Sequence, residues 1–313
     1  MKFRTIIATG VVAFACLPLM HGWGGVGHKS VGELARMKLT SATRAWVTKL
    51  LGNDDLADVA VWADEVRSAG RHSGPLVADA EAIAFNNKFP KNSGWHFVDL
   101  PLGTKAYTLS GKFSSKDDIV HVINRCLEVL EDRSSEFTKA QALRLLVHFV
   151  GDLHQPMHAS TGYYNLSNPA APKLVTDPSA VDVNTGDRGG NSLHLGKSDE
   201  LHSMWDSDLV RKFGGGDFKK LADKLAGKSP ASLTPGDYHH WAEAWATESV
   251  GVAAGAYRGI IFGRAELNKR HQLDQIDITL PPNYAKLNEQ VAGSQLAKAG
   301  FRLAELLNRI QVK

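Results

Sequence analysis

The chain has 313 residues, of which 43% are hydrophobic and 22% are charged, and its formal net charge at pH 7 is +3. A charge this small excludes a protein that binds nucleic acid through a broadly basic surface, so any contact with phosphate must be local. The length suits one large domain or two small ones.

Residues 1–22 are typical of a cleavable secretory signal. The segment MKFR carries two cations, and TIIATGVVAFACLPLM is an apolar run of about 16 residues. That run is shorter than the roughly 20 residues of a membrane span. We therefore expect cleavage before Trp23, a secreted or periplasmic protein of net charge +1, and no membrane insertion after cleavage. A retained N-terminal anchor and lipidation at Cys16 are the alternatives.

The rest of the chain has the pattern of a helical protein. Apolar residues at helical spacing predict helices over residues 30–52, 114–132, 138–155, 199–213, 238–263 and 284–310. Alternation with a period of two residues, which would indicate strands, is scarce. Residues 161–190 are rich in Asn, Pro, Asp and Gly and predict a long loop, which is more often functional than idle. We expect a single all-α domain over residues 23–313.

Cysteine usage adds one constraint. After cleavage only Cys126 remains, so the mature chain cannot form an internal disulfide. For an exported protein this indicates either a core large enough to need no cross-link or a metal that supplies one.

Histidine and aspartate recur at metal-ligand spacing. His148 and Asp152 are four residues apart on one predicted helix, so they share a face, and His158 follows shortly after. His202 and Asp206 repeat the spacing on another helix. Neutral imidazole and carboxylate are ligands that zinc accepts. One such pair is commonly a mere surface contact, but two pairs with His158 beside the first favour a metal site.

Two further stretches place polar residues among apolar ones. WADEVR contains Asp64, and a buried carboxylate needs a cation as its partner, either a metal or the nearby Arg67. WHFVDLP contains His96 and Asp99 among large apolar residues. Taken alone, His96 is more simply interpreted as a core histidine with a satisfied hydrogen bond.

These motifs together resemble one family. WGGVGH, WADEVR, WHFVDLP, HFVGDLHQPMH, GDRGGN and LHSMWD occur in the order found in the secreted, zinc-dependent, single-strand-specific nucleases of the S-one/P-one type, and cover almost the whole mature chain. The resemblance implies an all-helical fold, shared with zinc-dependent phospholipase C, and three Zn²⁺ ions per chain. It also implies hydrolysis of single-stranded DNA and RNA to 5′-phosphorylated products, and of 3′-mononucleotides, by a monomer.

The resemblance assigns the zinc ligands residue by residue. It implies Trp23, His28 and Asp152 for the first ion, Asp152, Asp64, His96 and His148 for the second, and His158, His202 and Asp206 for the third. Trp23 would bind through its α-amino nitrogen and its carbonyl oxygen. Since an amide nitrogen cannot bind zinc as a free amine does, cleavage before Trp23 would create this ligand, and export and activation would be coupled.

The resemblance also implies catalytic roles. Two zinc ions bridged by Asp152 and a water would generate a hydroxide that attacks phosphorus, with Asp64 as a further catalytic ligand and the third ion beside the departing 3′ oxygen. Arg67 matches a phosphate-contacting arginine. Its alternative role is a salt bridge to Asp64.

Substrate contacts are implied at three positions. Phe97 would stack on a nucleobase and Asp99 would accept a hydrogen bond from its edge, while Asn191 of GDRGGN would line the cleft. Both base contacts require an unpaired base, which agrees with single-strand preference. The alternative for Phe97 is core packing.

Two other functions fit part of the pattern. A tri-zinc phospholipase C also uses an N-terminal tryptophan, but there the first histidine lies farther along the chain and the last ligand is typically Glu. A zinc-storage protein would carry His-rich tracts, which the sequence lacks. His154 is expected to support the site rather than ligate, and His194, His239, His240 and His271 match no motif. The loop between His158 and His202 is longer than usual in the family.

Overall fold

The computed structural model describes residues 23–228 and 234–311. The predicted leader, residues 1–22, lies outside this part of the chain. The helices are α1 (Gly25–Lys38), α2 (Ser41–Leu51), α3 (Leu56–Val59), α4 (Trp62–Gly70), α5 (Ala80–Lys88), α6 (Ile119–Leu130), α7 (Lys139–Leu153), α8 (Pro156–Ala159), α9 (Leu201–Ser203), α10 (Leu209–Gly214), α11 (Phe218–Ala226), α12 (Trp241–Ala256) and α13 (Tyr284–Gln311).

Short strands and turns of other helical types complete the described residues. The strands are β1 (Leu100–Pro101), β2 (Ser160–Thr161), β3 (Tyr163–Asn165), β4 (Lys173–Val175), β5 (Leu193–His194), β6 (Ile261–Leu267) and β7 (Leu273–Thr279). The turns are η1 (Asn92–Gly94), η2 (Pro178–Ala180), η3 (Val183–Thr185) and η5 (Tyr238–His240), of 3₁₀ type, and η4 (Met204–Asp208), of π type. The expected helical fold is confirmed as a mainly helical one.

Helix α7 is the centre of the helical body. Its start is fixed by a capping box, in which the Thr138 side chain accepts from the backbone of Gln141 and the Gln141 side chain accepts from the backbone of Thr138. From Ala142 to Leu153 all but one residue is buried, and α1, α3, α4, α6, α12 and α13 all pack against it. Pro156 starts α8 directly afterwards, so the chain turns sharply at the end of α7.

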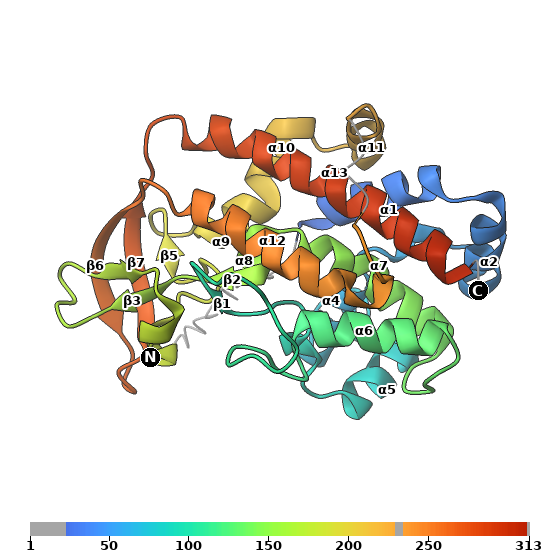
Figure 1. The fold of residues 1–313 in the computed structure, drawn as a ribbon, viewed down its shortest axis with the longest axis horizontal. Coiled ribbons are helices and arrows are strands. Elements are labelled where there is room, and N and C mark those ends of the chain that lie inside the picture. The colour runs from blue at the N-terminus through green and yellow to red at the C-terminus, as the bar shows by residue number, and fades with distance from the viewer. Residues whose placement is uncertain (1–22, 229–233, 312–313) are drawn as a thin grey trace, which may run out of the picture.

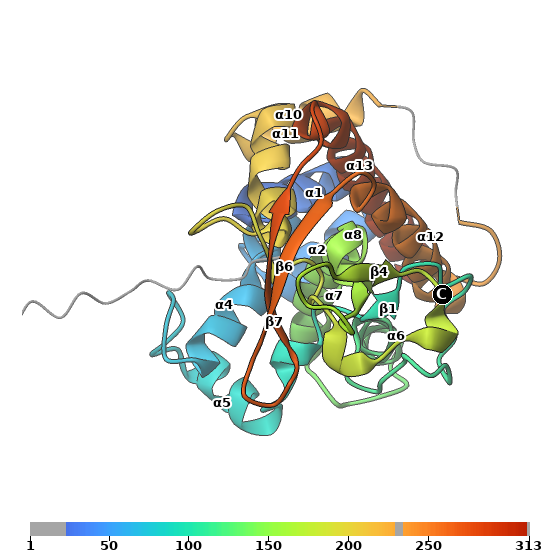
Figure 2. The ribbon, with the colours of Figure 1, turned by 90° about the vertical axis from the view of Figure 1, so that its left-hand side faces the viewer.

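The outer helices and a small sheet surround this centre. The long helix α13 lies along α1 and α10, and the β6–β7 hairpin stands at the opposite end from α2 (Figure 1). Figure 2 looks onto this hairpin. β5 pairs in parallel with β7, and the backbone of Ile276 on β7 donates to the carbonyl of Ser192 at 2.8 Å. The hairpin therefore anchors the segment that follows Asn191.

Several predicted helices have different limits in the structure. The helix predicted over 114–132 begins only at Ile119, and the one predicted over 199–213 consists of α9, η4 and α10. The helix predicted over 30–52 is two helices, because the Thr40 side chain accepts from the backbone N–H of Thr43 and caps a new start. The helix predicted over 238–263 ends at Ala256, since Gly259 turns the chain with a φ of +75° and Ile261 begins β6.

The predicted loop over residues 161–190 carries more order than expected. β3 and β4 form an antiparallel pair within it, and Tyr163 and Tyr164 are buried. The carbonyl of Pro169 accepts from the backbone of Ala265 at 2.7 Å, so the loop packs against the hairpin.

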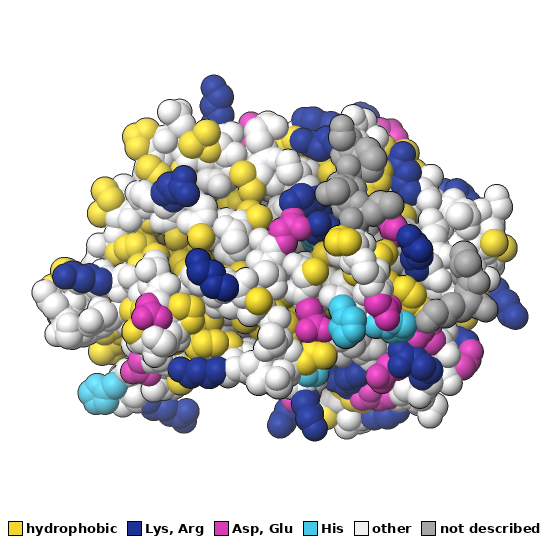
Figure 3. Space-filling view, in the orientation of Figure 1, with side chains coloured by type: hydrophobic (Ala, Val, Ile, Leu, Met, Phe, Trp, Pro, Cys, Tyr) yellow, Lys and Arg dark blue, Asp and Glu magenta, His cyan; other side chains and the backbone are white. Residues whose placement is uncertain are grey.

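The surface and the core agree with the composition. On the face shown in Figure 3, lysine and arginine side chains are dispersed among acidic, polar and apolar ones rather than gathered into one basic patch. Cys126 on α6 is fully buried and forms no disulfide, and burial raises the pKa of its thiol. Within the described ranges, no helix is both long and apolar enough to serve as a membrane span.

Candidate functional site

Asp152 lies at the centre of a buried cluster of histidines. His148 lies one turn earlier on α7, and its Nε2 is 3.0 Å from Asp152 Oδ2. His96 Nδ1 approaches the same oxygen at 3.0 Å, and His28 Nε2 lies 3.2 Å from Oδ1. His158 on α8 adds a contact of 3.7 Å to Oδ1. The two oxygens of one carboxylate thus face imidazoles from four segments of the chain.

The imidazole and carboxylate groups fall into three sets that meet the spacing of metal ligands. In each set the ligand atoms lie within 4.8 Å of one another. We call them the first ligand group (His28, His148 and Asp152), the second (Asp64, His96 and His148) and the third (His158, His202 and Asp206). The second and third groups have the membership that the resemblance implies, apart from the shared Asp152. In the first, His148 joins His28 and Asp152.

Trp23 lies beside the first and third groups. Its side chain is fully buried, and the backbone N–H of Gly24 donates to the carbonyl of Asp206 at 2.7 Å. A Cβ on Gly27 would lie 2.7 Å from Trp23 Cβ, and a Cβ on Gly151 would lie 2.9 Å from His28 Nδ1. These two glycines therefore let Trp23 and α7 approach the start of α1 closely.

Backbone carbonyls fix the orientation of three imidazole rings. The Nδ1 atoms of His148, His158 and His202 each lie 2.7 Å from a carbonyl, those of Ala60, His96 and Gly189 respectively. Because a carbonyl only accepts, each Nδ1 carries the hydrogen and Nε2 is left as a lone-pair donor. This is the usual arrangement around histidine ligands of metals.

Several buried atoms of the site have no hydrogen-bond partner within the described chain. They include both ring nitrogens of His28, Asp64 Oδ2 and Asp152 Oδ1, because the 3.2 Å contact between His28 Nε2 and Asp152 Oδ1 does not have the geometry of a hydrogen bond. Buried polar atoms without partners are costly and rare in native proteins. Imidazole and carboxylate lone pairs that converge in one place fit a bound cation, and this donor set is one that zinc accepts.

The electrostatics of the cluster favour the protonation states that metal binding requires. Burial, together with neighbouring positive charge, lowers the pKa of His28 and brings that of His96 to about 3. Burial opposes ionisation of Asp64 and Asp152, yet His148 and the other cations around them hold both carboxyl pKa values below the usual range. At neutral pH these carboxylates are ionised and His28 and His96 are neutral.

His148 is the exception within the cluster. Burial acts to lower its pKa, but Asp152 and Asp64 raise it to about 9. The ring therefore takes a positive charge readily, and a metal cation would compete with a proton for Nε2.

Arg67 is bound to a member of the second group. Its Nη2 donates to Asp64 Oδ1 at 2.6 Å, and both side chains are buried. The salt bridge considered from the sequence is therefore present. The guanidinium also lines a cavity next to His158 and His202, so a contact with a ligand in that cavity remains a prediction.

The cavity beside the third group contains the predicted substrate residues. This cavity, which we call the smaller cavity, has a volume of about 150 Å³. It is lined by Arg67, Phe97, Asp99, Met157, His158, Arg188, Asn191 and His202. The Phe97 side chain is 37% exposed, which excludes simple core packing. Asp99 Oδ1 accepts from the Thr161 hydroxyl at 2.5 Å, and burial raises the pKa of the Asp99 carboxyl.

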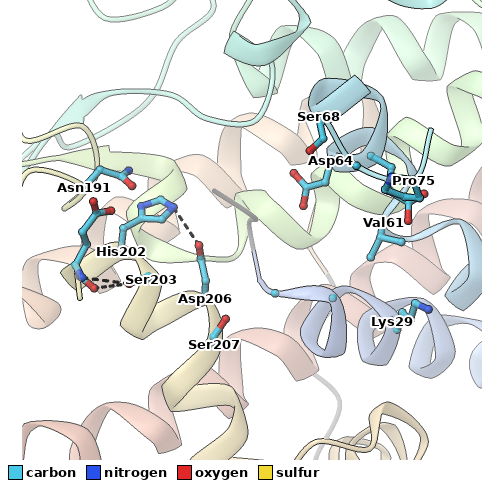
Figure 4. Close-up of a pocket in the computed structure, with 15 residues that line it drawn as sticks. Lys29, Val61, Asp64, Ser68, Pro75, Asn191, His202, Ser203, Asp206 and Ser207 are labelled. Atoms are coloured by element: carbon cyan, nitrogen blue, oxygen red, sulfur yellow. Dashed lines mark hydrogen bonds and ion pairs between the residues drawn. The ribbon is translucent and has the colours of Figure 1, made fainter. Parts of the chain in front are cut away.

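A larger cavity, of about 440 Å³, also borders the third group, at His202 and Asp206. Its walls are formed by Gly24, Gly25, Lys29, Val61, Asp64, Glu65, Ser68, Gly74, Pro75, Asn191, Glu200, His202, Ser203, Asp206 and Ser207 (Figure 4). Asn191 and His202 line both cavities. Asn191 Nδ2 donates to the Arg188 carbonyl at 2.6 Å, and its buried Oδ1 has no hydrogen-bond partner in the described chain.

Two supporting residues were not singled out from the sequence. Gln155 Nε2 donates to Asp206 Oδ1 at 2.7 Å, while its Oε1 accepts from the backbone of Met157. Asp187, the second residue of GDRGGN, is fully buried and holds the turn that follows it. In that turn a Cβ on Gly189 would lie 2.2 Å from the carbonyl oxygen of Met157, so only glycine fits there. The glycines of GDRGGN were therefore the sequence signal for a tight turn that Asp187 could stabilise.

The remaining histidines lie outside the three ligand groups. His154 Nδ1 bonds to the Val150 carbonyl at 2.8 Å and Nε2 accepts from Arg302 at 2.9 Å. Burial and that arginine lower the His154 pKa to about 3. His194, His239, His240 and His271 belong to none of the groups found in the described residues.

Comparison with known proteins adds a family match. A family model described as S1/P1 Nuclease matches residues 23–311. The chain is similar to "Nuclease S1" of Aspergillus oryzae, with 24% identity over 97% of both chains. It is 27% identical to "Nuclease P1" of Penicillium citrinum over 92% of this chain and 97% of the relative. "Endonuclease 2" of Arabidopsis thaliana is 23% identical over 94% of this chain and 92% of the relative.

Proposed function

Because the chain belongs to the S1/P1 nuclease family, we propose that it is a zinc-dependent endonuclease specific for single strands. It hydrolyses the phosphodiester bonds of single-stranded DNA and RNA to 5′-phosphorylated products, and it also hydrolyses 3′-mononucleotides. One observation carries the proposal: three buried groups of histidine and aspartate meet between two cavities, one of which contains an exposed aromatic ring.

Three Zn²⁺ ions fit the three ligand groups. Asp152 would help to hold both the first and the second ion, because its two oxygens face different histidines. The α-amino nitrogen and carbonyl oxygen of Trp23 would complete the first group after removal of the leader. Bound zinc supplies Lewis acidity, polarising a phosphoryl oxygen and lowering the pKa of water.

The side chains around the metals bind and orient the substrate. Arg67 donates to a phosphate oxygen while its salt bridge to Asp64 holds the guanidinium in place. Phe97 stacks on a base, Asp99 accepts from the base edge, and Asn191, which lines the same cavity, contacts the nucleotide. Because a stacked base must leave its pairing partner, the enzyme prefers single strands.

The family match favours nuclease activity over phospholipase activity. We propose that the protein is exported, that cleavage leaves Trp23 as the first residue, and that the mature chain acts as a monomer without inserting into a membrane.

The test is to purify the exported protein, sequence its N-terminus and count its metals. We expect Trp23 first, three zinc ions per chain, and 5′-phosphorylated products from single-stranded DNA and RNA, with duplex DNA cleaved more slowly. Phospholipid vesicles serve as the control substrate for the phospholipase alternative. If the protein with three bound zinc ions leaves both single strands intact, the proposal is wrong.

A pair of variants tests the sharing of Asp152. Asp152→Ala is expected to lose more activity than Asp206→Ala, because Asp152 contacts two ligand groups and Asp206 one. Equal residual rates at matched zinc occupancy would contradict the shared role.

A further inference from the structure

The two cavities are consecutive compartments of one site. They share Asn191 and His202 as a common wall, and the smaller one contains Phe97 and Asp99. The larger cavity borders the second ligand group at Asp64 and the third at His202 and Asp206. A phosphate held by the ligand groups would therefore lie at the boundary between the compartments.

The larger cavity has room for more than a phosphate. Its volume of about 440 Å³ falls within the range of small-molecule pockets, about 300–1,000 Å³. In Figure 4, Asn191 and His202 lie on one side, and Val61, Pro75 and Lys29 lie on the opposite side beyond Asp64 and Asp206. A mononucleotide with its base against Phe97 would leave that far side empty.

The walls of the far side suit a nucleoside and its following phosphate. Val61 and Pro75 present apolar surface, and Ser68 presents a hydroxyl. Lys29 is the one lysine or arginine among the described residues that line this cavity. Glu65 and Glu200 also line it, and because like charges repel, they direct a phosphate chain toward Lys29.

We propose that the larger cavity is the subsite for the nucleotide on the 3′ side of the cleaved bond, which leaves as the 5′-phosphorylated product. Lys29 contacts the next phosphate along the strand. This assignment rests on the proposed nuclease function and adds to it the reason why a strand, and not only a 3′-mononucleotide, is held.

The first test fills the cavity. Val61→Trp is compared with Val183→Trp, a matched change at a side chain that is 65% exposed and lines neither cavity. The substrates are deoxyadenosine 3′-monophosphate and the dinucleotide d(ApA), and calorimetry measures the binding of deoxyadenosine 5′-monophosphate. In Val61→Trp, kcat/KM for d(ApA) relative to that for the 3′-mononucleotide should fall at least about tenfold, as expected for one lost base contact. Binding of the 5′-mononucleotide should weaken in parallel.

The second test removes the charge. Lys29→Gln is compared with Lys220→Gln, whose side chain is 83% exposed on α11. For a single-stranded oligonucleotide, Lys29→Gln should lower the slope of log KM against log salt concentration by about 0.7, the value for one phosphate contact on a single strand. Lys220→Gln should leave the slope unchanged.

The outcomes separate the two proposals. If wild type cleaves neither substrate, the proposed function fails. If wild type cleaves both substrates but Val61→Trp slows both cleavages equally, the subsite assignment is wrong. It is also wrong if Val61→Trp leaves unchanged both the ratio of kcat/KM for d(ApA) to that for the 3′-mononucleotide and the binding of the 5′-mononucleotide. An unchanged salt slope in Lys29→Gln removes Lys29 from the phosphate path.

Discussion

At the scale of single residues, the ligand groups are held by atoms that are not themselves ligands. The carbonyls of Ala60, His96 and Gly189 each fix one histidine ring through Nδ1. Gln155 fixes one oxygen of Asp206, so the other, Oδ2, is the one that faces His202 at 3.3 Å. Such outer contacts commonly account for 10- to 100-fold in metal affinity.

Gln155 should therefore control the affinity of the third group for zinc. In Gln155→Met the Asp206 carboxylate loses its buried donor, and we expect zinc affinity at one of three sites to fall about tenfold or more. Equilibrium dialysis against graded chelator measures this directly. Gln295→Met is the matched control, since buried Gln295 donates to the carbonyl of His154 rather than to a ligand. Equal zinc affinity in the two variants would contradict the role of Gln155.

The buried carboxyl of Asp187 should make the free energy of unfolding depend on pH. It accepts from the backbone of Gly162 and Gly190 and from the hydroxyls of Tyr164 and Tyr257, but burial outweighs these donors and raises its pKa to about 6. The folded state then binds more protons than the unfolded state between about pH 4 and pH 6. The contribution of this group to stability is full below that window and is lost as the pH rises through it.

Asp187→Asn removes this titration. From pH 8 to pH 5, the wild type should gain about 1 kcal/mol of unfolding free energy relative to Asp187→Asn. Urea unfolding of both proteins at the two pH values measures the change, and the metal ligands titrate equally in both. A stability difference that is the same at pH 5 and pH 8 would refute the raised pKa.

At the scale of elements, close helix contacts depend on glycine. A Cβ on Gly32 of α1 would lie 2.4 Å from the carbonyl oxygen of Leu56, where α3 begins. Backbone atoms cannot yield as a flexible side chain can. The close approach of α1 to α3 therefore fixes the position of α3, which directly precedes the helix α4 that carries Asp64.

Gly32→Ala is expected to lower the free energy of unfolding by about 1–3 kcal/mol, as overpacking in a core does. Gly251→Ala on α12 is the control, because a Cβ there meets nothing within 4 Å. That change should instead stabilise the protein by about 0.5–1 kcal/mol through helix propensity. Chemical denaturation of both variants measures the change in unfolding free energy, which should be negative for Gly32→Ala and positive for Gly251→Ala. Equal changes would argue against the predicted contact.

Local patterns predicted most helices but not all of their limits. The apolar residues keep helical spacing across residues 30–52, but Thr40 caps a new helix within that range. Periodicity alone does not show whether a helix continues past such a cap or ends before it. In LDQIDIT, residues Leu273, Ile276 and Ile278 are buried while their neighbours face outward. Only Ile276 and Ile278 keep the period of two residues that indicates a strand, so the signal is short and irregular, and β7 becomes stable only by pairing with β5 and β6.

At the scale of the whole molecule, residues from Trp23 to Asp206 meet in one site. Motif resemblance predicted nine ligands, and the structure brings the eight histidine and aspartate side chains among them into three adjacent groups. The sequence could not predict the second cavity or the roles of Gln155 and Asp187. These depend on where backbone from distant segments passes, which no single motif records.

Metal removal should destabilise the whole fold. The ligand groups join α1, α4, the segment between η1 and β1 that contains His96, α7, α8, α9 and η4, and the described residues contain no disulfide to join them otherwise. A site saturated a thousandfold contributes about 4 kcal/mol. Chelation should therefore lower Tm by about 10 °C or more, and added zinc should restore it. An unchanged Tm after verified loss of metal, measured by calorimetry, would show that the helices do not need this cross-link.

The buried position of Cys126 makes the mature chain suitable for site-specific labelling. Its thiol is fully enclosed by α6 and its neighbours, and the other cysteine, Cys16, falls in the predicted leader. A cysteine introduced at an exposed position such as Leu287, which is 68% exposed, would be the single thiol accessible to a maleimide dye. Fluorescence could then follow a strand entering the site in real time, without first removing a native thiol.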